Sequence, residues 1–576
     1  MPTALLSKAR TGRHTIWLGV PVLAGLAYAP GVGAQAAPQV APSQVTPRDI
    51  APPPRTDTPP PLTLPDGGPT GAPVTDRGAD LPVDPGRPDL EGAFPEMARA
   101  NAAFARQIAR RPMTVGGLFD AALRLEQAYA RHGYVLARVT IPPQQLAPGR
   151  PLRVVITDGF IEAVDVSALS PARRGMVMAR LRFLVGRRHI TQAAIERALL
   201  LASDLPGAHL RSALTRGDQS GGARLIVEGH FDRFNGALGI DNTLPASLGT
   251  WAVNASLAAN GLLGLGDQIY GFAGAQPALG RYGFPNSPFG VLGGGLTVPL
   301  GHGGVTLNGE AVVSRTQPAP QPGVPVTVGN FTRLQLRLAV PVVRTRRETL
   351  RLTGTFAAIR QTLRAPDFDL ALNRDSYRAL RIGAEWHHQL PGVQTGLDLL
   401  LSHGLGGRDG TLALPLSRQG ADSHFTTLAA TARVGVGLPQ DLHLNLVARG
   451  QAAFGQPQML SEQFTLDGPE AASTLPSGSA SVDQGLTLRA EAGHTLPPIL
   501  RGAVIEHYLF AAQGWGWLNA ASAVEPRFTT LHAFGMGARF ALTGKPGASL
   551  NVELGITGGH ARPDGARVNV STAVRF

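Results

Sequence analysis

The sequence predicts a transmembrane β-barrel of about 16 antiparallel strands, preceded by two small α/β domains. Residues 233–576 alternate apolar and polar side chains with a period of two, and Gly, Asn, Asp and Pro punctuate the alternating segments. The N-terminus has the features of a secretory signal. The last residue, Phe576, is aromatic and ends an alternating segment, as is usual for outer-membrane barrels. Together these features indicate an exported chain that spans a membrane with strands.

The first two segments of the chain are not expected to fold. Residues 1–36 combine a basic start, a short apolar core and an Ala-Gln-Ala cleavage sequence, so we interpret them as a signal peptide. The apolar core is too short for a transmembrane helix. Residues 37–87 are crowded with Pro, Gly and small polar residues and cannot bury enough apolar surface to fold. We predict a disordered, semi-rigid linker there.

Residues 88–166 and 167–232 share one order of elements, in which helices precede strands, and are predicted to be two domains in tandem. Helices are expected over residues 96–111, 114–132, 172–183 and 191–203. Strands are expected over residues 134–141, 150–157, 209–214 and 223–228. The helix over residues 96–111 either belongs to the first domain or forms a separate plug.

The alternating segments of residues 233–576 place apolar side chains on one face and polar side chains on the other. Leu334 and Leu336, for example, alternate with Arg333 and Gln335. A soluble sandwich would give the same pattern. The secretory signal and the length of the alternating region favour a membrane barrel instead. Allowing about ten residues for each spanning strand, and about twenty with its turn, the region holds roughly sixteen strands.

Composition restricts the possible functions. The formal net charge is +12 and the calculated pI is about 10.8, which would also suit a nucleic-acid-binding protein. The arginines, however, are spread along strand-like segments, so we expect them to face a solvated barrel lumen and predict no nucleic-acid partner. The chain has no Cys, which excludes disulfides and suits an oxidising compartment.

The sequence offers no catalytic or cofactor-binding motif. P-loop, nucleophile-elbow and zinc-protease patterns are all missing. The paired His387 and His388 could hold a metal, but neighbouring residues of a strand point to opposite faces. We therefore predict no enzyme activity, no cofactor and no metal.

Several short motifs resemble those of one known protein family and occur in the same order. His-Gly-Tyr-Val at residues 132–135 and Asp-Gly-Phe-Ile-Glu at 158–162 resemble the first of two polypeptide transport-associated (POTRA) domains, the second stretch being its last strand and exit. Glu-Arg-Ala-Leu-Leu-Leu at 196–201, followed by Asp-Leu-Pro-Gly at 204–207, is similar to the second POTRA domain. Gly-Leu-Gly-Asp-Gln at 264–268 resembles the turn into the third barrel strand. The chain thus resembles the outer-membrane transporters of two-partner secretion, the family of haemolysin and filamentous-haemagglutinin secretion proteins.

The resemblance implies a function and a location. A monomer in outer-membrane lipid, with its POTRA domains in the periplasm, would export an unfolded partner protein without ATP. The second POTRA domain would bind that partner by β-augmentation. The side chains expected to take part are Glu196, Arg197, Leu200, Leu205, Leu210 and Leu214. An outer-membrane insertase and a passive diffusion channel are the alternatives.

The family's sixth extracellular loop normally enters the lumen, where its arginine pairs with an aspartate of the barrel wall. The corresponding loop residues here are Gly468, Pro469, Ala471, Ala472, Ser473 and Thr474, without arginine. The matching wall strand carries Phe510, Ala512 and Gly514, with alanine in place of aspartate. Losing one partner of a buried ion pair costs about 3–5 kcal/mol, whereas replacing both can be close to neutral. The fold is therefore expected to survive, and the family's own ion pair is not expected to hold the loop.

Overall fold

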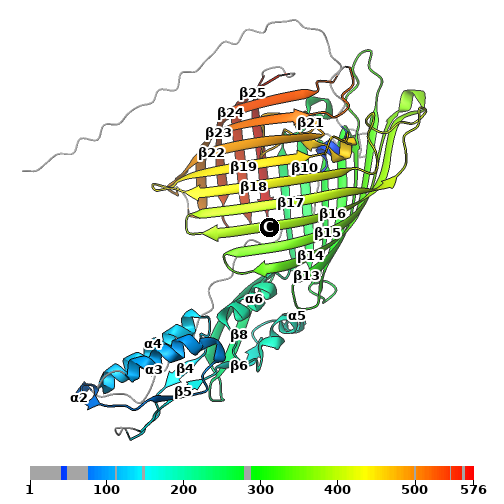
Figure 1. The fold of residues 1–576 in the computed structure, drawn as a ribbon. Helices are drawn as coiled ribbons and strands as arrows, with labels where there is room; N and C mark the ends of the chain where they lie inside the picture. The colour runs from blue at the N-terminus through cyan, green and yellow to red at the C-terminus, as the bar shows by residue number, and fades with distance from the viewer. Residues whose placement is uncertain are drawn as a thin grey trace, which may run out of the picture. The chain divides into compact units, whose positions relative to one another are not determined.

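The computed structural model describes residues 41–47, 76–109, 113–145, 150–277, 287–498, 501–523, 525–544, 546–560 and 565–576. These residues form two small α/β domains and a β-barrel (Figure 1). The predicted signal peptide, residues 1–36, lies outside the described residues, as does most of the predicted linker. Within the linker range the structure describes two four-residue helices, α1 (Pro42–Val45) and α2 (Asp76–Ala79), and a two-residue strand, β1 (Pro82–Val83).

The first α/β domain packs two helices against a three-stranded sheet. Its elements are β2 (Pro88–Glu91), η1 (Pro95–Met97), α3 (Ala98–Ile108), β3 (Met113–Thr114), α4 (Val115–Arg131), β4 (Arg138–Thr140) and β5 (Leu152–Thr157). The central strand β5 is parallel to β2 and antiparallel to β4. Phe104 and Ile108 of α3 are buried with Leu118 and Tyr129 of α4. The helix predicted over residues 96–111 therefore belongs to this domain.

The strand predicted over residues 134–141 is shorter than expected. The backbone N–H of Tyr134 donates to the carbonyl of Tyr129 at the end of α4, and that of Ala137 donates to the carbonyl of Tyr134. These bonds make residues 134–137 a turn that ends the helix. Only β4 continues as a strand.

The second α/β domain has the same plan. Its elements are β6 (Phe160–Asp165), α5 (Pro171–Leu181), η2 (Arg182–Leu184), α6 (Gln192–Ser203), β7 (Ala208–Arg216) and β8 (Gly222–Phe231). The helix α6 begins where the side chain of Thr191 accepts a hydrogen bond from the backbone N–H of Ala194. In the sheet, β8 lies between β6 and β7.

The boundary between the two domains falls earlier than residue 166. The strand β6, predicted to end the first domain, pairs in parallel with β8 of the second domain. Its Ile161 is fully buried in the second core, together with Leu205 and Leu225. Pairing and packing thus both assign residues 160–166 to the second domain.

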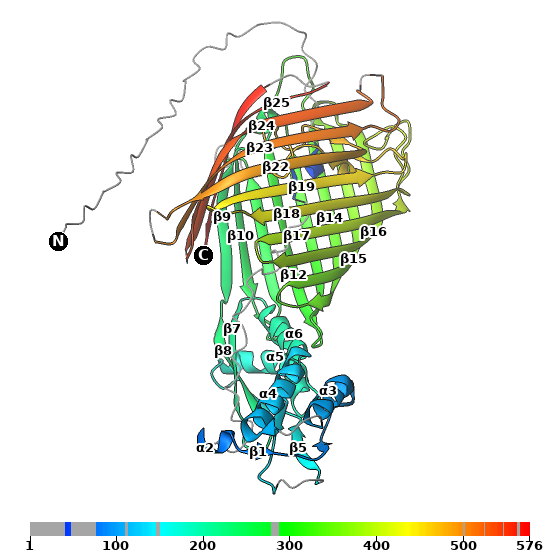
Figure 2. The same cartoon turned by 60° about the vertical axis from the view of Figure 1, so that its left-hand side comes forward.

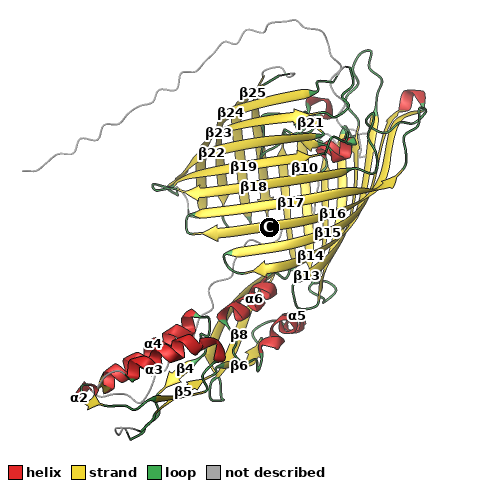
Figure 3. Cartoon of the chain, viewed as in Figure 1, coloured by secondary structure: helices red, strands yellow, loops and turns green. Residues whose placement is uncertain are grey.

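Sixteen antiparallel strands close into a barrel (Figures 1 and 3). They are β9 (Phe234–Asp241), β10 (Ala252–Asn260), β11 (Gln268–Ala275), β12 (Phe289–Leu300), β13 (Val305–Thr316), β14 (Val328–Arg344), β15 (Glu348–Ala365), β16 (Leu370–Leu390), β17 (Val393–Gly407), β18 (Thr426–Gly437), β19 (Leu442–Ala452), β22 (Gln484–Leu496), β23 (Ala503–Trp517), β24 (Phe528–Leu542), β25 (Gly547–Gly558) and β26 (Gly565–Arg575). The predicted fold class is confirmed. Among the described residues, no helix is long and apolar enough to cross a membrane.

The last strand completes the closure. β26 pairs with β9 from Ser571 opposite Asp241 to Arg575 opposite Ala237. The terminal Phe576 then exchanges two backbone hydrogen bonds with Gly236, of 3.0 and 3.1 Å. Figure 2 shows the C-terminus beside β9. A closed sheet leaves no strand edge to be hydrated, which is the condition for a sheet to survive in lipid.

The predicted alternation corresponds to the two faces of the barrel wall. Leu334 and Leu336 of β14 point outward and are 54% and 51% exposed, as expected for side chains that meet lipid. Arg333 and Gln335, which alternate with them, point inward and are buried. There Arg333 pairs with Glu310 of β13 at 3.0 Å. Arg333 thus faces a polar lumen, where an acidic partner neutralises its charge.

Candidate functional site

The loop between β19 and β22, residues 453–483, folds into the barrel, and we call it the lumen loop. It contains η6 (Leu460–Glu462) and two short strands that pair antiparallel, β20 (Phe464–Thr465) and β21 (Ser481–Val482). The buried carboxylate of Asp467 accepts hydrogen bonds from the backbone N–H groups of Gly478 and Ala480, at 3.3 and 2.9 Å. These bonds join the two sides of the loop, which is therefore an ordered element.

The two positions that lack the family's ion pair meet in an apolar contact region. Ala472 of the loop is 4% exposed and Ala512 of the wall strand β23 is 8% exposed. Both belong to one buried cluster with Phe464, Phe510 and Leu531. The joint replacement predicted from the sequence has thus left no uncompensated charge here. An apolar contact occupies the place of the ion pair.

An arginine of the wall holds the loop from the opposite direction. Arg489 lies on β22, and its side chain is 1% exposed. Its Nη1 donates to the carbonyl oxygen of Ala471 at 3.1 Å and to the hydroxyl of Ser473 at 2.7 Å. The guanidinium also lies over the ring of Phe510, 4.2 Å from its centroid. The cation in this contact therefore belongs to the wall. The resemblance to the family implies the opposite arrangement, with an arginine of the loop bound to the wall.

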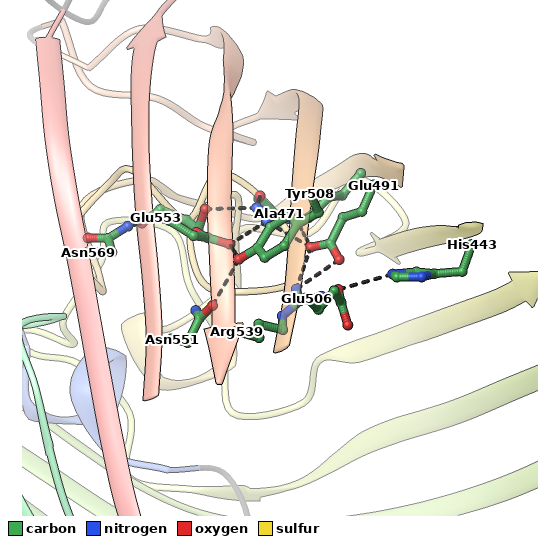
Figure 4. A network of polar contacts seen from close by, with 11 residues as sticks. His443, Ala471, Glu491, Glu506, Tyr508, Arg539, Asn551, Glu553 and Asn569 are labelled. Carbon is green, nitrogen blue, oxygen red and sulfur yellow. Dashed lines mark hydrogen bonds and ion pairs between the residues drawn. The ribbon is translucent and has the colours of Figure 1, made fainter. Parts of the chain in front are cut away.

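Two carboxylates hold Arg489 in place, those of Glu491 and Glu553, which are labelled in Figure 4. Its Nη2 donates to Glu553 Oε1 at 2.7 Å and its Nε to Glu491 Oε1 at 2.8 Å. The hydroxyl of Tyr508 donates to the same oxygen of Glu553 at 2.6 Å. Arg539 extends the network from Glu491 to Glu506, at 2.8 and 2.7 Å. Because both carboxylates are already bonded to it, the buried guanidinium is fixed in the orientation that reaches the loop.

The far side of the same loop tip contacts the last two strands. The Asn569 side chain of β26 donates to the carbonyl oxygen of Ser473, and the hydroxyls of Thr474 and Thr557 are hydrogen-bonded. A Cβ at Gly555 would lie 2.6 Å from the Thr474 methyl group, so only glycine permits this approach. The four residues 471–474 are thus bound by β22, β25 and β26 together.

Two further ion pairs attach the sides of the loop to the wall. Arg433 of β18 forms a bidentate pair with Glu470, at 2.8 and 2.9 Å. Arg381 of β16 pairs with Glu462 at 2.5 Å, and the hydroxyl of Tyr377 donates to the same carboxylate oxygen. Gly468 and Pro469, which precede Glu470, turn the chain, and Gly468 has a left-handed φ of +106°.

The segment Ala41–Pro47, drawn in blue near β21 in Figure 1, also lies against the lumen loop. The Gln44 side chain donates to Ser481 of β21 at 2.8 Å. The Thr46 hydroxyl is 2.5 Å from that of Ser314 on β13, and Arg333 of β14 donates to the carbonyl oxygen of Pro47 at 3.3 Å. A segment that the sequence analysis placed in a disordered linker is therefore bound inside the barrel.

A cavity of about 1020 Å³ lies beside the loop in the lumen. Its basic lining residues are Arg344, Arg346, Arg347, Arg351, Arg433, Arg489 and Arg539. Its acidic lining residues are Asp204, Glu348, Glu385, Glu470, Glu491 and Glu553. Such a lining solvates polar chains without a strong preference for either charge.

The leucines predicted to bind a partner lie in the core of the second domain. Leu200, Leu205, Leu210 and Leu214 are all buried, with 1–6% exposure. Their side chains pack inside the domain, so they reach no partner unless the domain unfolds. The strand β7, which carries Leu210 and Leu214, is the terminal strand of its sheet.

The two charged residues of that prediction contact the barrel. Arg197 of α6 donates to the carbonyl oxygens of Pro341 and Val342 in β14, at 2.9 and 3.2 Å. Glu196 lies 3.4 Å from Arg346 in the turn after β14. Close by, Asp204 and Arg344 form a bidentate pair at 2.7 and 2.9 Å. The charged side of α6 is therefore an attachment to the barrel.

Sequence patterns could have found some of the residues that hold the loop. Period-two alternation places Arg489 and Asn569 on the lumen face of their strands. It does not tell which lumen residues reach the loop, because the bond from Asn569 to Ser473 spans 96 residues of sequence. The pairing of Arg433 with Glu470 likewise depends on the path of the folded loop.

Comparison with known proteins identifies the chain. The model of the family "Haemolysin secretion/activation protein ShlB/FhaC/HecB" matches residues 225–540, more than half of the sequence. The chain belongs to this family. The model of the ShlB-type POTRA domain matches residues 89–159, which agrees with a domain boundary near residue 159. As a family member, the protein is an outer-membrane transporter of the two-partner secretion type and not an enzyme.

Individual relatives of this transporter are distant in sequence. The heme/hemopexin transporter protein HuxB of Haemophilus influenzae (strain 86-028NP) is 21% identical over 463 residues, 77% of each chain. The structure of CdiB from Escherichia coli has a TM-score of 0.69 at 18% identity, and the match covers 93% of this chain and 94% of CdiB. CdiB from Acinetobacter baumannii has a TM-score of 0.60 at 16% identity, with 88% and 93% covered. At these identities the structural matches establish the fold.

Proposed function

We propose that this transporter secretes an unfolded partner protein from the periplasm to the cell surface through the barrel lumen. The observation that carries the proposal is the attachment of the lumen loop, which combines hydrogen bonds and ion pairs to the wall with one apolar cluster. Water or a passing polypeptide can replace such bonds, each of which contributes only about 1 kcal/mol net. The loop can then leave its place without unfolding the barrel.

The cavity beside the loop supports passage of an unfolded chain. It is lined by both guanidinium and carboxylate groups, and the loop itself contributes Gly468, Glu470 and Ser473. Mixed charges offer hydrogen-bond partners to any extended backbone and give no single site deep enough to trap it. Movement outward would be driven by folding of the partner at the surface, because the sequence contains no P-loop for a nucleotide.

The POTRA domains, placed in the periplasm, would capture the partner first. In the second domain, β7 is the last strand in the sheet order β6-β8-β7. An extended segment of the partner can add to that edge by main-chain hydrogen bonds. Arg211 lies on β7, and its side chain is exposed on one face of the sheet, beside this edge.

Deletion of residues 160–232 tests the role of the second POTRA domain. The barrel should still assemble, which heat-modifiable migration on gels would demonstrate, and secretion of the partner should stop. Continued secretion by the assembled barrel would overturn the proposal.

A photo-crosslinking residue at position 211 gives a more direct test of capture. The partner should be cross-linked from position 211 and not from position 106, an exposed residue of α3 in the first domain. HuxB is named as a heme/hemopexin transporter. An exported protein that takes part in heme/hemopexin transport is therefore the first partner to try.

A further inference from the structure

Two histidines and an aspartate gather where the second POTRA domain continues into the barrel. His209 of β7 and His230 of β8 are directly opposite in the antiparallel register. Opposed residues of antiparallel strands point to the same face. Asp232 follows two residues after His230, so it lies on that face too, and the first barrel strand starts at Phe234.

The potential ligand atoms of the three side chains all lie within 4.8 Å of one another. His209 Nε2 is 2.8 Å from Asp232 Oδ2, and His230 Nε2 is 3.9 Å from Asp232 Oδ1. The two imidazole rings are stacked, with centroids 4.6 Å apart. The His230 side chain is 72% exposed, so it has room to turn its Nε2 toward a point that the other two residues share.

We propose that His209, His230 and Asp232 bind a divalent transition-metal ion of the zinc class. Two neutral imidazoles and one carboxylate are a donor set that zinc and its neighbours prefer, and calcium or magnesium would require oxygen ligands instead. The site is open to solvent on the side of His230, which leaves coordination positions for water.

The charged residues near the three side chains are Arg173, Arg211 and Glu228. Arg173, a nearby cation whose guanidinium lies 5.5 Å from the ring of Phe231, donates to the carbonyl oxygens of Asn260 and Gly261. Glu228, two residues before His230 on the same face, lies directly opposite Arg211 of β7, so these two charges offset each other and Asp232 supplies the negative charge of the site.

Binding would brace the passage from the domain into the barrel. The backbone N–H of Asp232 donates to the carbonyl oxygen of Gly207 at 2.9 Å, and the Asn260 side chain of β10 donates to the carbonyl oxygen of Asp232 at 2.9 Å. A metal ion that joins Asp232 to His209 would fasten the start of β7 to the same point. The orientation of the edge strand β7 would then depend on metal occupancy.

The test is calorimetric titration of Zn²⁺ into the full-length protein, purified in detergent without a polyhistidine tag and stripped of metal. One ion should bind per chain, and the double variant His209→Ala/His230→Ala should lose at least about tenfold in affinity, as should Asp232→Asn. Co²⁺ should give the visible absorption of a nitrogen–oxygen site in the parent protein alone. Heat-modifiable migration would verify that each variant is folded.

The chain provides a matched control. His494 of β22 and His507 of β23 are also directly opposed across two strands, with ring centroids 5.2 Å apart, but they lie on the outer wall. The variant His494→Ala/His507→Ala should bind Zn²⁺ as the parent does. No binding by the parent, or equal binding by the folded His209/His230 variant, would overturn the proposal.

Discussion

Arg489 holds the lumen loop, although no sequence motif pointed to this residue. It is a buried cation with two carboxylate partners on the wall and two acceptors on the loop. Arg489→Ala would release the loop and leave Glu491 and Glu553 short of a partner, at a cost of about 3–5 kcal/mol. We expect a higher mean conductance in planar lipid bilayers, because the loop would spend more time out of the lumen.

Arg351→Ala is the control for that variant. Arg351 is another arginine of the cavity lining, and its pair with Glu385, at 3.2 Å, joins two wall strands without touching the loop. Its conductance should remain that of the parent. If both variants conduct alike, the loop is not held by Arg489.

The pair of Arg433 and Glu470 permits a test by charge reversal. Their side chains are 38% and 42% exposed, so the pair should be worth only about 0.5–1 kcal/mol. Arg433→Glu and Glu470→Arg should each raise conductance, by less than Arg489→Ala does. The double reversal restores opposite charges at this pair and should recover part of the parent conductance; the recovery is partial because Arg433 also pairs with Asp398 at 2.5 Å. A double variant that conducts at least as much as either single one would contradict this assignment.

Among the elements, the segment Ala41–Pro47 adds a second restraint on the loop. Gln44→Ala with Thr46→Val removes its side-chain hydrogen bonds to β21 and β13 and should raise conductance moderately. The control is Ser43→Ala, because the buried Ser43 hydroxyl has no hydrogen-bond partner among the described residues. Equal conductance of both variants and the parent would mean that these bonds do not restrain the loop.

The end of β26 determines how the barrel closes. Phe576 contributes the last backbone bonds to β9, and its side chain approaches Gly236, where a Cβ would lie 2.7 Å from the ring. Deletion of Phe576 should lower the amount of heat-modifiable barrel, whereas Phe576→Trp should retain most of it. Val574→Ala, on the outward face of the same strand, serves as control. Normal barrel levels after deletion would show that closure does not need this residue.

Periodicity predicted the regular elements well because side-chain burial repeats with the backbone. The helix over residues 114–132 and the alternation around Leu334 both appear as expected. The assignment of β6 to the first domain was wrong, because it rested on the resemblance of residues 158–162 to that domain's last strand, whereas β6 pairs with β8 about 60 residues later. The bound segment Ala41–Pro47 has no periodic pattern, and only its partners on β13, β14 and β21 order it.

For the whole molecule, the alternating pattern predicted the barrel, and the short motifs predicted the family. The candidate site was less predictable, because the missing ion pair was visible at Ala472 and Ala512 but its replacement by Arg489 was not. The leucines chosen as partner contacts carried the helical and strand periodicity of a core, and the structure buries them. A periodic apolar residue in a small domain is therefore better assigned to its core than to a partner.

If this transporter exports one dedicated partner, the proteins at the cell surface and in the culture fluid should differ between cells with and without its gene. We predict the loss of one large exported protein, with other outer-membrane barrels unchanged and restoration by the intact gene. A broad loss of barrels would mean that the protein is an insertase. No change in any exported protein would contradict secretion and leave a passive channel as the function.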